Sequence, residues 1–372
     1  MRRQVWVDID LGALSDNIGK IKSIVGSSVK ILAVLKQSAY GHGIIQVARK
    51  LYEEGVDAFG VGGINEAIQL REDGYRGQII LLSIVSKELA AFFIRFGITP
   101  TVADLSFARE LNREALKIKK VVPVHIKVDT GMGRLGFYPD QIYPFLEKLK
   151  KFSWLSLEGL YTHFPAADTN FNFTNRQLNI FRKLIKDLKT KSIDFNYYHS
   201  ANSLGVVNYP NSYLNMVRPG LILYGIKPSA DLRVELKPVL SFKAKIIFIK
   251  EILPGKTVGY GREFIAKKKT RVATVSVGYA DGYPWALSNC AKVLIKGKIF
   301  SIAGRVCMDH IMIDLGQDKE IKKGDVVTLI GKDQDKEVKA EDLASWAQTI
   351  PYEIVTRISR EIPRYYLNKS TD

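Results

Sequence analysis

The stretch KILAVLKQSAYGHG (residues 30–43) joins a short apolar run to an abruptly polar segment. The apolar residues 31–35 lead directly to Lys36, and two glycines follow a few positions later. A run of this length predicts a buried strand, and the glycines predict a turn after it. A single lysine at the end of a strand is usually solvated. Its significance therefore depends on whether other strands of the chain end in the same way.

The alternation of a short apolar run with a helical pattern continues to about residue 225. Apolar and β-branched runs that are separated by helices of this kind are typical of parallel βαβ units. Eight runs predict an α/β fold with a closed (β/α)8 barrel of the TIM type, and an open doubly wound sheet remains the alternative. The predicted strands are residues 30–36, 58–62, 78–83, 98–103, 121–129, 155–164, 195–202 and 214–218.

The pattern changes near residue 241. Strand-like runs with glycine breaks dominate from there, until the helical pattern AEDLASWAQT at 340–349. The preceding stretch 226–240 carries two prolines and mixed charge, as linkers do. We therefore predict a barrel domain over residues 1–240 and a mainly β C-terminal domain over residues 241–372.

The charge of the chain is strongly basic, with 55 Lys and Arg against 38 Asp and Glu and a formal net charge of +17. Such an excess fits a nucleic acid or an anionic surface as a partner. The lysines are nevertheless spread along the chain in short groups, such as KKK at 267–269, without a recognisable nucleic-acid-binding module. Solvated helix faces and loops explain this distribution better, so we expect no nucleic-acid partner.

The composition also bears on the compartment. Hydrophobic residues make up 46% of the 372 residues, as in a globular protein large enough for two domains. Asp8 and Asp10 interrupt the apolar start, which argues against a secretory signal, and no run of about 18 apolar residues could span a bilayer. Cys290 and Cys307 are too few for a disulfide framework. These features predict a cytoplasmic protein without a membrane partner.

Polar and ionisable residues end several of the predicted barrel strands. In a parallel barrel the carboxyl ends of the strands form one rim, where catalytic residues are placed. Unrelated solvated strand ends would not converge on that rim, so we infer a functional site there. These strand-end residues are Lys36, Asp129, Arg134, His163, Asn202, Ser203 and Arg218.

The types of residue at this rim indicate a class of chemistry. A partly desolvated lysine becomes an amine nucleophile that can form a Schiff base. The loops after the seventh and eighth strands, 202–205 and 218–225, offer a hydroxyl group and backbone N–H groups for a phosphate. This layout suits an enzyme that uses pyridoxal 5'-phosphate (PLP). No glycine-rich phosphate loop and no metal-ligand spacing competes with it, so we expect no metal.

Motifs from both predicted domains resemble those of the alanine racemase family in order and spacing. The resemblance runs from VDIDLGALSDNI near the N-terminus to the last helix, which is effectively the whole chain. It implies a PLP-dependent enzyme of fold type III, with a (β/α)8 barrel and a C-terminal β domain. The matching motifs are AVLKQSAYGHG, HIKVDTGMGRLGF, YTHFPAAD, HSANSLG, VRPGLILYG, VGYG, VGYADGYP, GRVCMD and PYEIVTRIS.

The resemblance implies a division of roles among the site residues. Lys36 would hold PLP and act as one catalytic base, and Tyr260 would act as the second base from the partner subunit of a homodimer with shared active sites. Arg218 would face the pyridine nitrogen. Because a guanidinium group only donates hydrogen bonds, that nitrogen would stay unprotonated, which favours α-proton exchange over decarboxylation and transamination. His163 would link Arg218 to Tyr260 and help the phenol to ionise.

The remaining implied contacts surround the cofactor and the substrate. Arg134 would bind the phenolic oxygen of PLP and the substrate carboxylate, with Lys127 as a carbamate beside it. Gln37 and Ser38 depart from the alanine and asparagine usual in the family, which puts the fit of the cofactor or the rate in question. The implied phosphate contacts are Tyr40, Ser203, Gly220, Leu221 and Tyr352, and the implied substrate-pocket and entrance residues from the partner are Met308 and Tyr279.

The implied activity is the interconversion of L-alanine and D-alanine, which would supply D-alanine for peptidoglycan. A racemase for serine or for a broader set of amino acids is the alternative within the family. A PLP-dependent decarboxylase would need a carboxylate in place of Arg218, and a non-catalytic PLP-binding barrel would lack the β domain with Tyr260. The net charge leaves a polyanion-binding protein as a further alternative.

Overall fold

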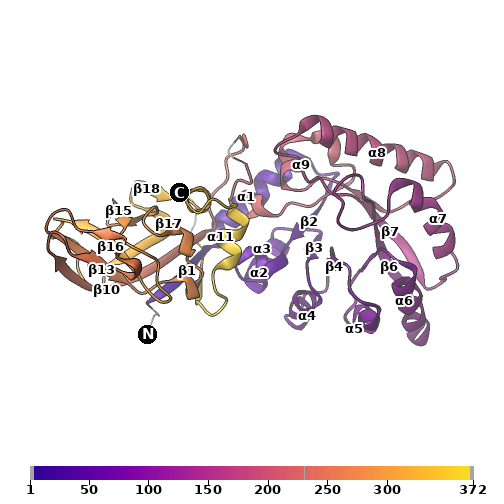
Figure 1. Cartoon of the computed structure of the whole chain (residues 1–372). Helices are drawn as coiled ribbons and strands as arrows, with labels where there is room; N and C mark the ends of the chain where they lie inside the picture. The colour runs from indigo at the N-terminus through magenta and orange to yellow at the C-terminus, as the bar shows by residue number, and fades with distance from the viewer. Residues whose placement is uncertain (1–3, 230, 369–372) are drawn as a thin grey trace.

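Two sheets organise the computed structural model, which describes residues 4–229 and 231–368. The parallel sheet and its helices form one domain, and the second sheet forms another domain beside it, with α11 (Pro351–Arg357) near their junction (Figure 1). Of the predicted ranges 1–240 and 241–372, residues 1–3, 230 and 369–372 lie outside the described part of the chain.

The parallel sheet has eight strands, and all its neighbouring strands pair in parallel in the order β4-β3-β2-β9-β8-β7-β6-β5. Thr99 closes the ring, because its backbone N–H donates to Ile79 O (2.8 Å) and its carbonyl accepts from Leu81 N (2.9 Å). The predicted closed barrel is therefore confirmed and the open sheet is excluded. Its strands are β2 (Lys30–Val34), β3 (Ala58–Val61), β4 (Gln78–Leu81), β5 (Thr101–Val102), β6 (Val122–Lys127), β7 (Leu155–Tyr161), β8 (Tyr197–His199) and β9 (Met216–Val217).

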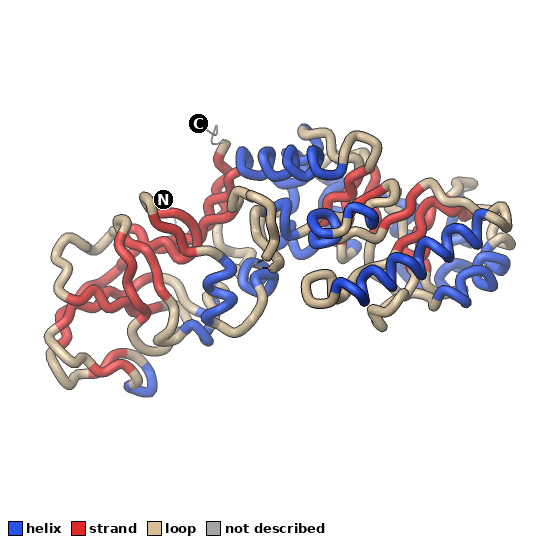
Figure 2. The backbone as a smooth tube through the Cα atoms, turned by 90° about the horizontal axis from the view of Figure 1, so that it is seen from above, coloured by secondary structure: helices blue, strands red, loops and turns tan. Residues whose placement is uncertain are grey.

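Amphipathic helices cover the barrel strands (Figure 2). α6 (Leu105–Ile118) shows the local cause: Asp104 caps it by accepting from Phe107 N at 2.8 Å, and the residues at three- and four-residue spacing are buried. The other barrel-domain helices longer than one turn are α1 (Leu11–Val25), α3 (Ile44–Glu53), α4 (Ile64–Glu72), α5 (Ala90–Phe96), α7 (Pro139–Leu149), α8 (Phe171–Lys189) and α9 (Ser203–Asn208).

The second sheet has nine strands in the order β18-β17-β14-β15-β16-β13-β10-β1-β19, and an additional pairing of β17 with β10 curls it back on itself. The mainly β character predicted for this region is confirmed, with α10 (Ala340–Trp346) and α11 as its α-helices. The strands after β1 (Val5–Asp10) are β10 (Leu240–Ile252), β13 (Thr270–Val275), β14 (Lys292–Ile295), β15 (Lys298–Ile302), β16 (Ile311–Gly316), β17 (Val326–Asp333), β18 (Lys336–Val338) and β19 (Arg364–Leu367), with a separate ribbon of β11 (Thr257–Val258) and β12 (Phe264–Ile265).

The N-terminal strand β1 belongs to this second sheet, although it lies in the range predicted for the barrel domain. Val7 pairs antiparallel with Phe242 of β10 and parallel with Arg364 of β19. The chain therefore starts in the β domain, enters the barrel through α1 and returns at β10. Within residues 4–229 and 231–368, no helix combines the length and hydropathy needed to cross a bilayer.

Candidate active site

A cavity of about 340 Å³ opens at the carboxyl ends of the barrel strands. All the predicted strand-end residues except Asp129 line it, and Tyr352, a phosphate contact that the resemblance implied, reaches it from α11 of the β domain. The predicted residues that line the cavity are Lys36, Tyr40, Lys127, Arg134, His163, Asn202, Ser203, Arg218, Gly220 and Tyr352.

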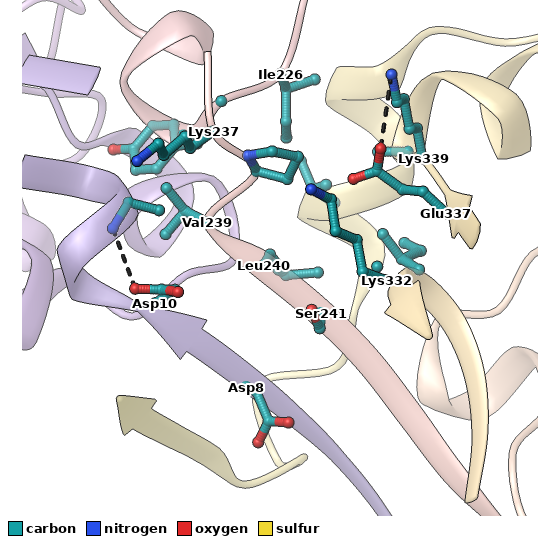
Figure 3. A pocket seen from close by; sticks show the side chains of 18 of the residues that line it. Asp8, Asp10, Ile226, Lys237, Val239, Leu240, Ser241, Lys332, Glu337 and Lys339 are labelled. Atoms are coloured by element: carbon teal, nitrogen blue, oxygen red, sulfur yellow. Dashed lines mark hydrogen bonds and ion pairs between the residues drawn. The ribbon is translucent and has the colours of Figure 1, made fainter. Parts of the chain in front are cut away.

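A larger cavity of about 400 Å³ lies between the two domains and holds none of the predicted site residues (Figure 3). Several of its charged groups already have partners: Lys243 donates to Asp8 at 2.9 Å, and Asp10 accepts from Ala13 N at 3.1 Å. Its larger size does not make it the reaction site, because the predicted lysine, arginine and histidine residues line the smaller cavity.

Lys36 begins α2 (Lys36–Tyr40), rather than ending a strand as predicted, because β2 already stops at Val34. The segment after it is a left-handed turn, in which Gln37, Ser38, Ala39 and Tyr40 have φ values between 52° and 54°. Left-handed backbone costs L-residues about 1–2 kcal/mol each, so the surrounding structure must hold this turn in place. The turn folds Tyr40 back so that Lys36 and Tyr40 face the same cavity.

The amine of Lys36 is poised to act as a nucleophile. Burial lowers its pKa, and the positive charge of Arg134 lowers it further, while Glu66 opposes both effects. Glu66 also supports the turn, since its carboxylate accepts from Ser38 N at 3.2 Å. Lys36 Nζ forms no hydrogen bond within the described residues, so its amine is available to a ligand in the cavity.

Arg218 is fixed by a set of buried acceptors. Its Nη2 donates to the carbonyl oxygens of Thr162 (2.7 Å) and Ser200 (3.0 Å), and its Nη1 donates to His199 Nδ1 at 2.9 Å. The predicted contact with His163 is present at 3.5 Å from Nη2 to Nδ1. Burial lowers the pKa of Arg218 to about 10, so its guanidinium group remains charged at neutral pH.

Four basic residues, Lys36, Lys127, Arg134 and Arg218, line the cavity, and no carboxylate is among its lining residues. Lys127 is the most affected: burial lowers its pKa well below the usual value, and Arg218 and Arg134 lower it further. Its Nζ lies 4.8 Å from the centre of the Tyr161 ring. A neutral amine at this position can react with carbon dioxide, so the burial of Lys127 fits the carbamate that the resemblance implied. The cavity as a whole is built for anionic groups.

One end of the cavity gathers hydrogen-bonding groups suited to a phosphate. Ser203 Oγ accepts from Gly220 N at 2.9 Å, and the Tyr40 ring lies 6.0 Å from that of Tyr352. A Cβ atom at Gly220 would lie 2.7 Å from the Tyr40 hydroxyl oxygen, so glycine permits this close approach. Leu221 starts η3 (Leu221–Tyr224) with its side chain fully buried and outside the cavity, which leaves its backbone as the group that can contact a ligand.

The predicted second base is absent from this cavity. Tyr260 lies on η4 (Tyr260–Arg262) of the β domain with 71% of its surface exposed, and Met308 and Tyr279 are exposed on the same domain. Met308 and the residue after Tyr279 are held together, because Ala280 N donates to the Met308 carbonyl at 3.0 Å. The cavity of one chain therefore contains one predicted base, Lys36, and not both.

Sequence reasoning missed several residues that complete this site. Tyr161 lines the cavity, and its ring stacks on that of His199 at 4.7 Å. His199 is fully buried and binds Arg218, although a histidine in an apolar strand is ordinarily a core residue. His199 lies inside the seventh predicted strand, 195–202, so a selection of strand-end residues passed over it, whereas the observed strand β8 ends at His199.

Comparisons with known proteins agree with this geometry. The family described as "Alanine racemase, N-terminal domain" matches residues 9–228, and "Alanine racemase, C-terminal domain" matches residues 239–366. An alanine racemase of Halothermothrix orenii is 43% identical over 370 residues, which cover 99% of this chain and 98% of that protein.

Solved structures give the same result. An alanine racemase of Clostridium difficile 630 is 38% identical with a TM-score of 0.93, over 99% of this chain and 97% of the other. The alanine racemase of Bacillus anthracis with bound L-Ala-P is 33% identical with a TM-score of 0.93, over 99% of this chain and 96% of the other. The chain therefore belongs to the alanine racemase family of PLP-dependent isomerases.

Proposed function

We propose that this protein interconverts L-alanine and D-alanine with PLP bound in the barrel cavity. The observation that carries the proposal is the placement of the partly desolvated Lys36 beside two guanidinium groups, those of Arg134 and Arg218, in one cavity whose lining residues include no carboxylate. This arrangement leaves a reactive amine beside charges that only an anionic ligand offsets. Family membership supplies the identity of the reaction.

The residues present fit PLP. Its phosphate suits the end formed by Tyr40, Ser203, Gly220 and Tyr352, where hydroxyl and backbone groups meet. Its phenolic oxygen suits Arg134, whose guanidinium group forms no hydrogen bond within the described residues. When bound, PLP delocalises the electron pair that remains at the substrate α-carbon after loss of its proton.

The side chains around the cavity then have separate tasks. Lys36 supplies the amine that anchors the cofactor and moves a proton to or from one face of the substrate. Arg218 presents hydrogen-bond donors to the pyridine nitrogen and, because its pKa remains about 10 in its buried position, has no tendency to hand over its proton at neutral pH. Arg134 binds the substrate carboxylate, and a carbamate on Lys127 provides an acceptor for that guanidinium group.

Racemisation requires a second proton carrier on the opposite face of the substrate. We propose that Tyr260 fills this role from the partner subunit of a homodimer, together with Met308 and Tyr279 at the substrate pocket and its entrance. The exposure of these three large side chains on the β domain supports the proposal, since each is accessible to a partner subunit. His163, within reach of Arg218, would then connect the two halves of each shared site.

The experiment that tests the function has two parts. Reduction of the PLP-loaded protein with borohydride, followed by peptide mapping, should place the cofactor on Lys36. Chiral chromatography after incubation with single L-amino acids should show D-alanine, with far less D-serine and no D-lysine or D-arginine. A label on another lysine would contradict the site, and preferential conversion of serine or of basic amino acids would establish the alternative specificity.

The physiological setting follows from the chemistry. D-Alanine is a component of bacterial peptidoglycan, so we propose a cytoplasmic enzyme that supplies it. Expression of the chain in a bacterium that requires D-alanine should remove that requirement, whereas Lys36→Ala should not. Continued dependence on external D-alanine, with the active protein present, would contradict the biosynthetic role.

A further inference from the structure

A series of hydrogen bonds, buried at Arg218, His199 and His125, leads from Arg218 away from the active site and through the barrel interior to Glu158 at the edge of the core. His199 Nδ1 accepts from Arg218 Nη1 at 2.9 Å, and His199 Nε2 lies 3.0 Å from His125 Nδ1. His125 Nε2 lies 3.2 Å from Glu158 Oε2, which also accepts from Gln78 Nε2 at 2.6 Å. Arg218 follows the carboxyl end of β9, whereas Gln78 begins β4, so the chain spans the barrel from one end toward the other.

The chemistry of Arg218 fixes the direction of every hydrogen bond in this chain. A guanidinium group only donates, so His199 must accept at Nδ1 and carry its proton at Nε2. That proton is donated to His125 Nδ1, so His125 carries its own proton at Nε2 and donates it to Glu158. Burial lowers the pKa of both imidazoles, which agrees with one proton on each ring. The carboxylate of Glu158 is therefore the terminal acceptor of the chain.

The surrounding structure is shaped to hold these rings. His125 and His199 are fully buried, and the Tyr161 ring lies parallel to that of His199, with an angle of 7° between them. Gly159 pairs with His125 across β6 and β7, and a Cβ atom there would lie 2.4 Å from the imidazole of His125. Only glycine leaves room for this ring position. The Glu158 side chain retains 17% exposure, so its charge lies at the edge of the core rather than within it.

These hydrogen bonds affect the position of the Arg218 guanidinium group, because His199 is the acceptor of its Nη1. The two other close acceptors, Thr162 O and Ser200 O, belong to the backbone and bind Nη2. Nε and the second Nη1 hydrogen have no acceptor within the described residues, so they are the donors left for the cavity. Hydrogen bonds in series strengthen one another, so Glu158 makes His199 a better acceptor for Nη1.

We propose that Glu158 is a positioning residue that acts through His125 and His199 to hold the Arg218 guanidinium group, and its proton, against the pyridine nitrogen of the cofactor. The inference rests on the proposed function, in which Arg218 faces that nitrogen. Loss of the terminal negative charge would weaken the acceptor at the end of this series of hydrogen bonds, loosen Arg218, allow the nitrogen to be protonated and favour side transamination.

The variant Glu158→Gln tests the proposal in the PLP-loaded enzyme. We expect kcat to fall about tenfold, the lower end of the loss found for outer hydrogen-bond partners of metal-bound histidines, with little change in KM for alanine. The ratio of transamination to racemisation should rise, and the absorption spectrum of the bound cofactor should change. Glu147→Gln is the matched control, since Glu147, on the surface of α7, forms its one ion pair among the described residues with Lys150. It should behave as the wild type in all four measurements.

A second variant changes the position of the His125 ring but keeps every hydrogen-bonding side chain. Gly159→Ala should displace the His125 ring and reproduce the changed spectrum and partition of Glu158→Gln. Independently, ¹⁵N NMR of the five histidines in the wild-type protein should show His125 and His199 both neutral with the proton on Nε2. This measurement determines which atom donates and which accepts in each hydrogen bond between Arg218 and Glu158, even where a variant does not fold.

The outcomes separate the inference from the function on which it rests. If Arg218→Glu changes the cofactor spectrum and raises transamination while Glu158→Gln leaves both unchanged, the positioning role is wrong and the proposed function stands. An Nδ1-protonated or doubly protonated His125 or His199 would also overturn it. Absence of PLP binding to Lys36 in the wild-type protein would overturn both proposals.

Discussion

Replacing Gly220 with alanine adds one methyl group where the barrel backbone meets Tyr40. The new Cβ atom would lie 2.7 Å from the Tyr40 hydroxyl oxygen. An ordinary contact between these atoms needs about 3.5 Å, so the hydroxyl must move by about 0.8 Å. Tyr40 cannot swing freely, because its ring packs against those of Tyr224 (5.2 Å) and Tyr352 (6.0 Å). The strain should cost about 1–3 kcal/mol of folding stability, the usual range for overpacking.

The displaced hydroxyl group would also lose the hydrogen bond that we propose it gives to the phosphate of PLP. A hydrogen bond to a charged group contributes about 1.5–3 kcal/mol, so Gly220→Ala should weaken PLP binding about 10–100-fold. The assay is a titration of the apoenzyme with PLP, followed by absorbance, beside thermal unfolding without PLP. Gly19→Ala is the control, because nothing lies within 4 Å of a Cβ atom there and alanine favours its helix. A Kd for Gly220→Ala within twofold of wild type would refute the assignment of Tyr40 to the phosphate.

Three further predictions concern the bases, the left-handed turn and the buried lysine. Lys36→Ala and Tyr260→Phe should each be nearly inactive. Mixing the two variants should restore activity after subunit exchange, because each hybrid dimer has one site with both bases. If no activity is recovered, the active sites are not shared between subunits. Ser38→Asn should stabilise the protein by about 0.5 kcal/mol in thermal unfolding, because asparagine tolerates positive φ better than serine; a lower Tm would contradict this account of the turn. The pKa of Lys127 is lowered in the folded state. At pH values between that lowered pKa and the ordinary lysine pKa, the unfolded state therefore binds more protons than the folded state. The free energy of unfolding of the CO₂-free apoenzyme should accordingly rise with pH across this window. Lys127→Met should abolish that rise, and an unchanged pH dependence of unfolding would contradict the burial of the amine.

The sequence was sufficient to predict the barrel because its strands are short apolar runs between clear helical patterns. Each of the eight predicted runs contains one observed barrel strand or overlaps it. Their lengths were overestimated where polar residues follow the strand, as at Lys36, because an apolar run does not show where ladder hydrogen bonds stop. The left-handed turn after Lys36 left no trace in the pattern of apolar residues.

Long-range pairing was not predictable from local pattern. β1 is an apolar run at the start of the chain, and nothing in its residues shows that it joins β10 and β19 rather than the barrel. The same limit applies to His125 and Glu158, which stand on neighbouring strands and meet only because of the register of β6 and β7. A lone buried histidine carries no sign of its partner.

The candidate site was predictable to the extent that its residues end strands of one barrel. Lys36, Arg134, His163, Ser203 and Arg218 were selected on that basis and line one cavity. Tyr260, Met308 and Tyr279 came from the family resemblance alone, and a single chain leaves them on the surface of the β domain. No pattern within one chain specifies which surface another copy covers.

Racemisation by two bases is tested most directly by converting L-alanine with the PLP-loaded enzyme in deuterium oxide. Deuterium at the α-carbon and the appearance of D-alanine are followed together. Two bases on opposite faces of the substrate predict that D-alanine formed in early turnovers carries deuterium at its α-carbon, because the proton removed by one base is not the one delivered by the other. α-Deuteration without D-alanine would show that one base acts alone and would contradict the role of Tyr260. Absence of both exchange and inversion, in protein that has bound PLP, would contradict the assignment of this chain as an alanine racemase.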